Sequence, residues 1–119
     1  MAVKFSNNAS TTLNGAITSA ATSIVVNDIS EFPTLASGDY TYLTLANATE
    51  TKIEIIKVTS IVSATKTLTA VRAQDNTTAQ AFSADDLCEL RMTAILLNDA
   101  ASQNDDVLGS AVSMSIALG

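Results

Sequence analysis

Short segments in which apolar and polar residues alternate recur along much of this chain, and they constrain its fold more than any other feature. The segment 40–45 is an example: Tyr40 and Tyr42 fall on one side of an extended backbone, and Leu43 and Leu45 fall on the other. Because successive side chains of a strand point to opposite faces, this period of two residues is typical of β-strands and not of helices. The abundance of Thr, Val and Ile in these segments favours strands further.

We predict strands in the segments that show this alternation and are bounded by turn residues: 22–27, 40–45, 52–61, 67–72 and 87–92. The short link 63–66 predicts a β-hairpin between the third and the fourth. The alternation slips at Ile55–Ile56, which indicates a bulge or burial of both faces. In the last segment Cys88, Leu90 and Met92 share one side. Several short strands at close spacing predict a mainly β protein, a small antiparallel β-sandwich or barrel.

The core of such a domain is expected to be thin. The chain has 119 residues, which suits one domain, and only 4% of them are aromatic, with no Trp. Since a single aromatic ring can bury about 150–250 Å², a core of Ala, Val, Ile and Leu buries less surface per side chain. We therefore expect part of the stability to come from association with neighbouring molecules.

The character of the chain changes after Thr93. Residues 94–101 predict a short helical turn, and Asn104–Asp106 are expected to end it. The last residues alternate again and form one apolar row, consisting of Val112, Met114, Ile116 and Leu118. This arm either closes the chain's own sheet or adds a strand to the edge of a neighbour, and the sequence leaves both open. The predicted division is a β-rich module at 1–97 and a C-terminal linker and arm at 98–119.

The charge balance excludes several kinds of partner. The chain has 6 Lys and Arg against 12 Asp and Glu, a net charge of −6. Nucleic acids are bound by basic residues that neutralise phosphates, so no nucleic-acid partner is expected. No apolar run approaches the ~20 residues that span a bilayer, and the N-terminus does not resemble a signal peptide. We expect a protein made in the cytoplasm, with no membrane partner.

The residue types needed for common enzyme chemistry are scarce. The absence of His removes the commonest general base. Cys88 is nucleophilic in principle, but its place in an apolar row favours a small buried residue. Glu50, Glu54 and Glu89 are candidates for a catalytic carboxylate pair, although alternating strands place such charges on solvent faces by default. We predict no catalytic residue.

Metal binding is not predicted either. Asp85–Asp86, Asp99 and Asp105–Asp106 offer oxygen ligands, but none of them matches the spacing of a calcium-binding loop. Aspartates in polar loops usually serve as turn or cap residues. No metal and no cofactor are therefore expected.

Several stretches taken together resemble a module of tailed-bacteriophage virion proteins. They are residues 3–13, residues 17–26 followed by Phe32–Pro33, and residues 55–59, 67–82 and 87–94. The family's module occurs at the N-termini of tail-fibre-like proteins and as small stand-alone virion proteins, and the resemblance covers about residues 3–97. The family usually has glycine where this chain has Ala73 and Asn76, and a basic residue is common in place of Gln80. Asn tolerates a left-handed backbone at modest cost, but Ala is harder to accommodate if positive φ is needed.

The resemblance implies a non-enzymatic structural protein of the phage virion, at a tail fibre, a fibre adaptor or the baseplate. Its expected partners are other phage virion proteins and further copies of itself in a homo-oligomer. A capsid decoration protein on the phage head is the alternative. The interface candidates are the arm residues Val112, Met114, Ile116 and Leu118 and, around the loop after residue 72, Arg72, Gln74, Asn76 and Phe82.

A third reading concerns Tyr40 and Tyr42, which form a possible aromatic contact on one side of their strand. They offer a platform for a glycan of the host surface or for a protein partner. Packing under a loop is favoured over such a platform, because aromatic rings bury a large area.

Overall fold

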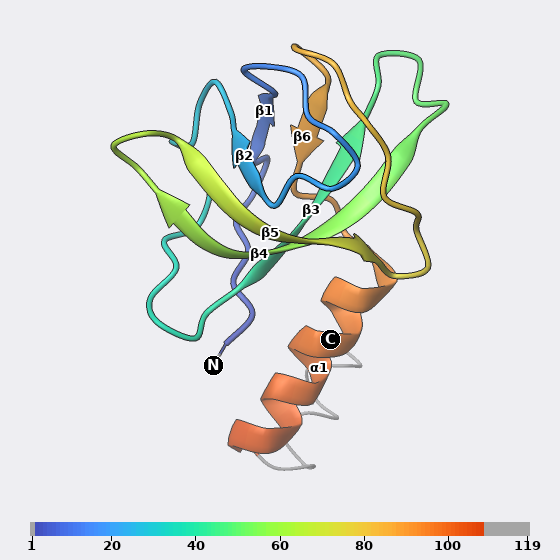
Figure 1. The fold of residues 1–119 in the computed structure, drawn as a ribbon. Coiled ribbons are helices and arrows are strands. Elements are labelled where there is room, and N and C mark those ends of the chain that lie inside the picture. Colours follow the sequence, from blue (N-terminus) through green and yellow to red (C-terminus); the bar gives the residue numbers. More distant parts are fainter. Residues whose placement is uncertain (1, 109–119) are drawn as a thin grey trace.

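The computed structural model describes the backbone of residues 2–108 and the side chains of residues 2–102. It contains β1 (Ser10–Thr12), β2 (Ser23–Val25), β3 (Thr41–Ala46), β4 (Ile53–Val62), β5 (Thr67–Gln74), β6 (Leu87–Glu89) and the helix α1 (Ala94–Leu108). The six strands form one sheet in the order β1-β6-β3-β4-β5-β2, with every pair antiparallel. The sheet curls into a half-barrel (Figure 1). The predicted mainly β fold is therefore confirmed.

The curl brings the two edges of the sheet together at one point. Leu13, directly after β1, pairs with Val26, directly after β2. The backbone N–H of Asn14 donates to the carbonyl of Val25 at 3.0 Å, and that of Asn27 donates to Thr12 at 3.0 Å. Both edge strands are only three residues long. Within residues 2–108, neither edge thus offers a long row of free backbone groups to an added strand.

The predicted irregularity at Ile55–Ile56 is confirmed as a register shift in the β4–β5 hairpin. The pairs Ile55–Gln74 and Lys57–Val71 are two steps apart along β4 and three along β5, so β5 holds an extra residue. A second shift follows between Val58 and Ser60. Because bulges bend strands and increase their twist, the two shifts help this long hairpin to wrap around the core.

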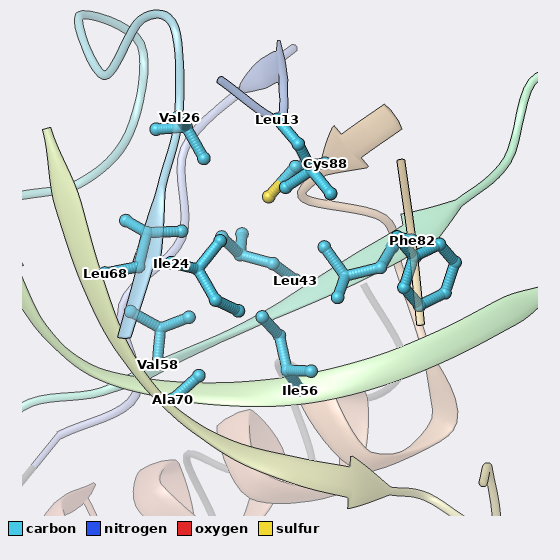
Figure 2. Close-up of a cluster of buried hydrophobic side chains, with 11 residues drawn as sticks. Leu13, Ile24, Val26, Leu43, Ile56, Val58, Leu68, Ala70, Phe82 and Cys88 are labelled. Carbon is cyan, nitrogen blue, oxygen red and sulfur yellow. The ribbon is translucent and has the colours of Figure 1, made fainter. Parts of the chain in front are cut away.

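The inner cluster of buried side chains fills the concave face of the sheet. Figure 2 shows that its members come from the strands β2, β3, β4, β5 and β6 and from the segments beside them, and that they point toward one another. They are Leu13, Ile24, Val26, Leu43, Leu45, Ile56, Val58, Leu68, Ala70, Phe82 and Cys88. All but one of these residues are aliphatic or Cys, as the composition predicts. Phe82 is the only ring among them in the described part of the chain.

A second apolar cluster lies on the convex face, where α1 packs across β3. Val3, Tyr42 and Leu96 are its buried members, and Ile95 and Ala100 are packed against it. All six residues of β3 are consequently buried. The predicted alternation in this strand is confirmed, since Leu43 faces the inner cluster and Tyr42 faces the helix. The sheet thus has a covered face on each side of β3.

The helix is longer than the sequence predicts. The Oγ1 of Thr93 accepts a hydrogen bond from the N–H of Leu96 at 3.3 Å, which caps the first turn. The helix then continues to Leu108, so the prediction that Asn104–Asp106 end it is wrong. Asn and Asp each cost only tenths of a kcal/mol in a helix that has already been nucleated and anchored. The predicted boundary between residues 97 and 98 falls within this helix, and the predicted arm at 112–118 lies outside the described residues.

The last strand is shorter than predicted. β6 ends at Glu89, and Leu90 packs against both apolar clusters. Met92, expected beside Cys88 and Leu90, is instead 69% exposed. The chain turns toward α1 after residue 90, so the period of two residues no longer applies to Met92.

The bulge in β5 holds a non-glycine residue in the left-handed region: Ala73 has φ 55°. Its side chain is exposed, so glycine would lose no packing there. We predict that Ala73→Gly raises the free energy of unfolding by about 0.5–1 kcal/mol, because relief of the left-handed strain outweighs the added freedom of the unfolded chain. Chemical denaturation measures this. Ala70→Gly, at a buried strand position in the same β5, is the control and should destabilise the protein; equal destabilisation by both would contradict the prediction.

Candidate functional site

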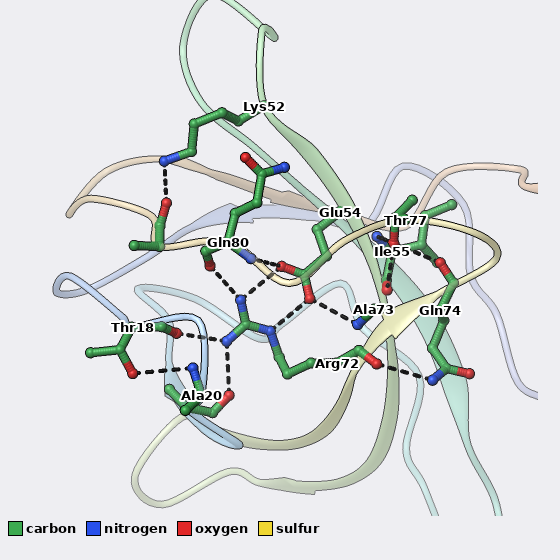
Figure 3. Close-up of polar contacts among 12 residues, drawn as sticks. Thr18, Ala20, Lys52, Glu54, Ile55, Arg72, Ala73, Gln74, Thr77 and Gln80 are labelled. Atoms are coloured by element: carbon green, nitrogen blue, oxygen red, sulfur yellow. Dashed lines mark hydrogen bonds and ion pairs between the residues drawn. The ribbon is translucent and has the colours of Figure 1, made fainter.

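A buried ion pair joins the two long strands at one end of the half-barrel. Glu54 of β4 is 0% exposed, and the side chain of Arg72 of β5 is 7% exposed. The guanidinium donates from Nε and Nη2 to the two carboxylate oxygens at 2.7 Å each (Figure 3). This is the bidentate geometry that makes arginine–carboxylate pairs strong. The prediction that Glu54 faces solvent is wrong.

The remaining donors of Arg72 reach into two loops. Nη1 donates to the carbonyls of Thr18 at 2.8 Å and Ala21 at 2.9 Å, and Nη2 also donates to the carbonyl of Gln80 at 2.6 Å. Together with the carboxylate bonds, these use all five N–H donors of the guanidinium. Arg72 therefore pairs with an acidic neighbour and holds two loops, and its side chain is too deeply buried to serve as the surface contact predicted for it.

Glu54 is equally well satisfied. Besides Arg72 it accepts hydrogen bonds from the backbone N–H groups of Ala73 at 2.9 Å and Gln80 at 3.0 Å. Burial acts to raise the pKa of this carboxyl, but the bonds from Arg72, Ala73 and Gln80 outweigh it and hold the pKa below its ordinary value of 4.5. Glu54 is thus an anion fixed in place and has no geometry for proton transfer to a ligand.

The sequence does contain a signal for this pair. Glu54 falls at alternate positions with Ile56 and Val58, so it belongs to the same face of β4 as these apolar residues. Arg72 likewise belongs to the same face of β5 as Leu68 and Ala70. Opposite charges on the apolar faces of two strands of one predicted hairpin indicate an internal ion pair. The face of the strand on which each charge lies is therefore more informative than the general rule that charged residues in strands face solvent.

The predicted loop candidates divide into surface and core residues. Asn76 is exposed, with φ 64°, and Gln74 is half-buried with its Nε2 donating to the carbonyl of Arg72 at 3.1 Å. Phe82 is 2% exposed, pairs through its backbone with Ile17, and belongs to the inner cluster. Phe82 therefore presents no surface to a partner in the folded chain, and Asn76 does.

The two tyrosines of the predicted aromatic contact hold the helix. Their rings meet edge to face, with centroids 5.6 Å apart, and both hydroxyls donate to the same oxygen of Asp99 at 2.8 Å. Burial, followed by the bond to Asp99, raises the pKa of Tyr40 to about 12 and raises the pKa of Tyr42 as well. The pair packs beneath α1, and not beneath a loop as expected. Tyr42 is buried and unavailable as a platform.

A small open pocket of about 220 Å³ lies beside Tyr40, lined also by Gly38, Asp39, Lys57 and Thr59. The ammonium group of Lys57 lies 4.4 Å from the centroid of the Tyr40 ring. This cation–π contact places a charged group over one face of the ring, which a sugar could otherwise stack against. The pocket is therefore poorly arranged for a glycan.

The other arginine forms a more exposed cluster. Arg91 donates from Nη2 to Glu50 at 2.6 Å and to Glu89 at 2.8 Å, which joins the β3–β4 turn to β6. The bond from Arg91 is the main cause that lowers the pKa of Glu89 below 4.5. Such partly exposed pairs contribute little to stability.

Cys88 lies in the inner cluster, as the sequence predicts. It is fully buried and unpaired by any disulfide, and burial raises the pKa of its thiol to about 12. Among the described residues, no group of three or more His, Cys, Asp or Glu is placed to hold a metal ion. Over the same part of the chain, no helix has both the length and the apolar character needed to cross a membrane.

No protein-family model matches the chain, and no curated protein matches it.

The ion pair generates a prediction about stability. Arg72→Met should lower the free energy of unfolding by about 3–5 kcal/mol, because Glu54 is left charged and unpaired in the interior. The double variant Glu54→Gln/Arg72→Met should lose less than Arg72→Met alone. Arg91→Met is the matched control on an exposed pair and should cost at most about 1 kcal/mol. Urea denaturation measures all three; a loss at Arg72 no larger than that at Arg91 would refute the role given to the pair.

The lowered pKa of Glu54 also predicts that the stability of the protein depends on pH in the acid range. Because the pKa of Glu54 is lower in the folded chain than its ordinary 4.5, its contribution is fully present above pH 4.5 and is lost as the pH falls through the folded value. The melting temperature should thus fall steeply below that pH. In Glu54→Gln/Arg72→Met the fall should be shallower, with the lowered pKa of Glu89 still contributing. Parallel acid profiles for the two proteins would show that Glu54 is not a source of the effect.

Proposed function

We propose that this chain is a non-enzymatic structural protein of a bacteriophage virion, a tail-fibre, fibre-adaptor or baseplate-associated subunit that acts through protein–protein contacts. The proposal starts from the resemblance of residues 3–97 to the virion module. The observation that carries it is the backbone conformation at two positions where this chain departs from the family's pattern.

Both of those positions have positive φ. Ala73 has φ 55° and Asn76 has φ 64°, and these are the places where the family usually has glycine. A left-handed backbone favours glycine because a Cβ is crowded there. The geometry thus supplies a physical reason for the family's glycines in this chain's own loop. That agreement supports the resemblance beyond the similarity of the residues themselves.

The disposition of chemical groups supports a role without catalysis. The chain has no His, the Cys88 thiol is buried with a raised pKa, and Glu54 is bound by Arg72 on both oxygens. The polar interactions in the interior connect strands with loops. They build a rigid module, which is what a particle subunit needs from its own chain.

The alternative is a capsid decoration protein, which would share the small size and β-rich fold. Copy number separates the two, since a tail position requires a few to a few dozen copies and a head position hundreds. Binding of a host glycan is less well supported, because Tyr42 is buried and Lys57 lies over one face of the Tyr40 ring.

The proposed function is tested on purified particles of the phage that encodes this sequence. We expect quantitative mass spectrometry to detect the chain in stoichiometric amounts relative to the other tail proteins, and a density map of the particle to show the half-barrel at the tail. Hundreds of copies on the head would establish the decoration alternative. Absence of the chain from washed, infectious particles would overturn the proposal.

A further inference from the structure

The seam between the two edges of the sheet, formed by residues 12–14 and 25–27, ends in an Asn–Gly pair. Asn14–Gly15 follows Leu13, which pairs with Val26, and both of its residues are exposed in a bend outside the strands. Figure 1 shows the ends of β1 and β2 near one another where the curled sheet comes together. This is the one place in the sequence where glycine follows asparagine. The pair therefore adjoins a joint of the fold.

Asparagine is a chemically labile residue, and a following glycine opens it to an intramolecular reaction. The backbone nitrogen of the glycine attacks the side-chain carbonyl carbon of the asparagine. A new C–N bond closes a succinimide ring, and the amide nitrogen leaves as ammonia with the proton of the attacking nitrogen. Water then opens the ring at either of its carbonyls. The products are aspartate and isoaspartate, in which the main chain runs through the former side-chain carbon.

The surroundings of Gly15 leave this reaction unobstructed. Apart from its chain neighbours, no atom of the described residues lies within 4 Å of the point where a Cβ at residue 15 would be. The N–H of Gly15 donates no hydrogen bond to this part of the chain, so its nitrogen is available for attack. The side chain of Asn14 is held only through its Nδ2, which donates to the Oδ1 of Asn27 at 3.0 Å. The attacking nitrogen and the carbonyl carbon are both accessible.

The other asparagines of the sequence lack this combination. Each is followed by a residue with a Cβ, which crowds the attacking nitrogen. They are Asn7, Asn8, Asn27, Asn47, Asn76, Asn98 and Asn104. The amide of Asn47 is also held at both ends, since its Nδ2 donates to Thr51 at 2.8 Å and its Oδ1 accepts from the N–H of Lys52 at 2.9 Å. Asn47 therefore serves as an internal reference for a slow position.

We propose that Asn14 is a site of spontaneous deamidation, in which the backbone nitrogen of Gly15 is the nucleophile and water supplies the oxygen of the new carboxylate. The modified chain is loosened at the seam. The reaction requires no enzyme, metal or partner, because both reacting groups belong to the chain itself. The inference goes beyond the proposed function and does not depend on it, since it follows from the residues at the seam.

The products do not fit the hydrogen bonds of the seam. The Nδ2 of Asn27 donates to the Oγ1 of Thr12 at 2.7 Å and to the carbonyl of Leu13 at 3.4 Å, so its Oδ1 is left to face residue 14. A carboxylate at residue 14 has no proton to donate to that oxygen, and two acceptors then face each other. Reversal of the Asn27 amide would break both of its bonds beside β1. Isoaspartate also adds an atom to the main chain directly after the bond from the N–H of Asn14 to the carbonyl of Val25.

The reaction is tested by incubating the folded full chain in mildly alkaline buffer and following its peptides by mass spectrometry. The peptide with Asn14 should exchange its amide for a carboxyl group about tenfold faster, or more, than the peptide with Asn47. Gly15→Ala is the matched control, because the open space accepts a methyl group and the φ of Gly15 is not positive. It should slow the reaction at Asn14 by about tenfold or more. Equal rates at 14 and 47, or an unchanged rate in Gly15→Ala, would overturn the proposed site.

The effect on the seam is tested with Asn14→Asp, which is one of the two products. Its melting temperature should be lower than that of the wild type by about 4 °C or more, because two acceptors face each other at the seam. Asn7→Asp is the matched control: it makes the same change of charge at an exposed side chain that has no hydrogen bond within the described residues. It should shift the melting temperature by less than about 2 °C. Equal melting temperatures for the two variants would overturn the loosening of the seam, even where the reaction at Asn14 is observed.

Discussion

The bidentate pair between Glu54 and Arg72 is the interaction on which the loops at one end of the half-barrel depend. It lies where the bulge in β5 opens the β4–β5 hairpin, and its spare donors and acceptors hold the backbone at Thr18, Ala21 and Gln80. The same loops also place Phe82 in the inner cluster and Ile17 against it. A buried charge pair with every hydrogen bond satisfied gives them one geometry, and removal of either partner leaves a costly group behind.

The opposite side of the sheet is organised by a different acceptor. The carboxylate of Asp99 receives both tyrosine hydroxyls and so fixes the start of α1 against β3. Thr93 caps the first turn, and the carboxylate of Asp75 accepts a hydrogen bond from the N–H of Ile95 at 3.3 Å. The inner cluster and the helix therefore share β3 as a common wall. This arrangement fixes the first two turns of the helix on the convex face of the sheet.

Much of the fold was predictable because strand alternation is a local property. The long hairpin, the slip at Ile55–Ile56 and the burial of Cys88 all follow from residue order alone. The three-residue strand β1 is too short to show an alternating pattern. It forms because it pairs with β6 and because Leu13 beside it pairs with Val26. The general rule that a lone charge in a strand faces solvent places Glu54 on the wrong side. Its place on the same face of β4 as Ile56 indicates that it points inward, but its partners come from the bulge in β5 and from a distant loop.

The sequence by itself determined a single β-rich domain with a small aliphatic core and without histidine chemistry, because composition and a period of two residues are sufficient for those conclusions. The tertiary structure decided which charged side chains are buried, which element covers Tyr40 and Tyr42, and where α1 ends. Those features depend on contacts between residues far apart in the chain, such as Tyr40 and Asp99, which are 59 positions apart. Local patterns cannot encode which distant group completes a hydrogen bond, since that depends on how the sheet curls and where its loops return.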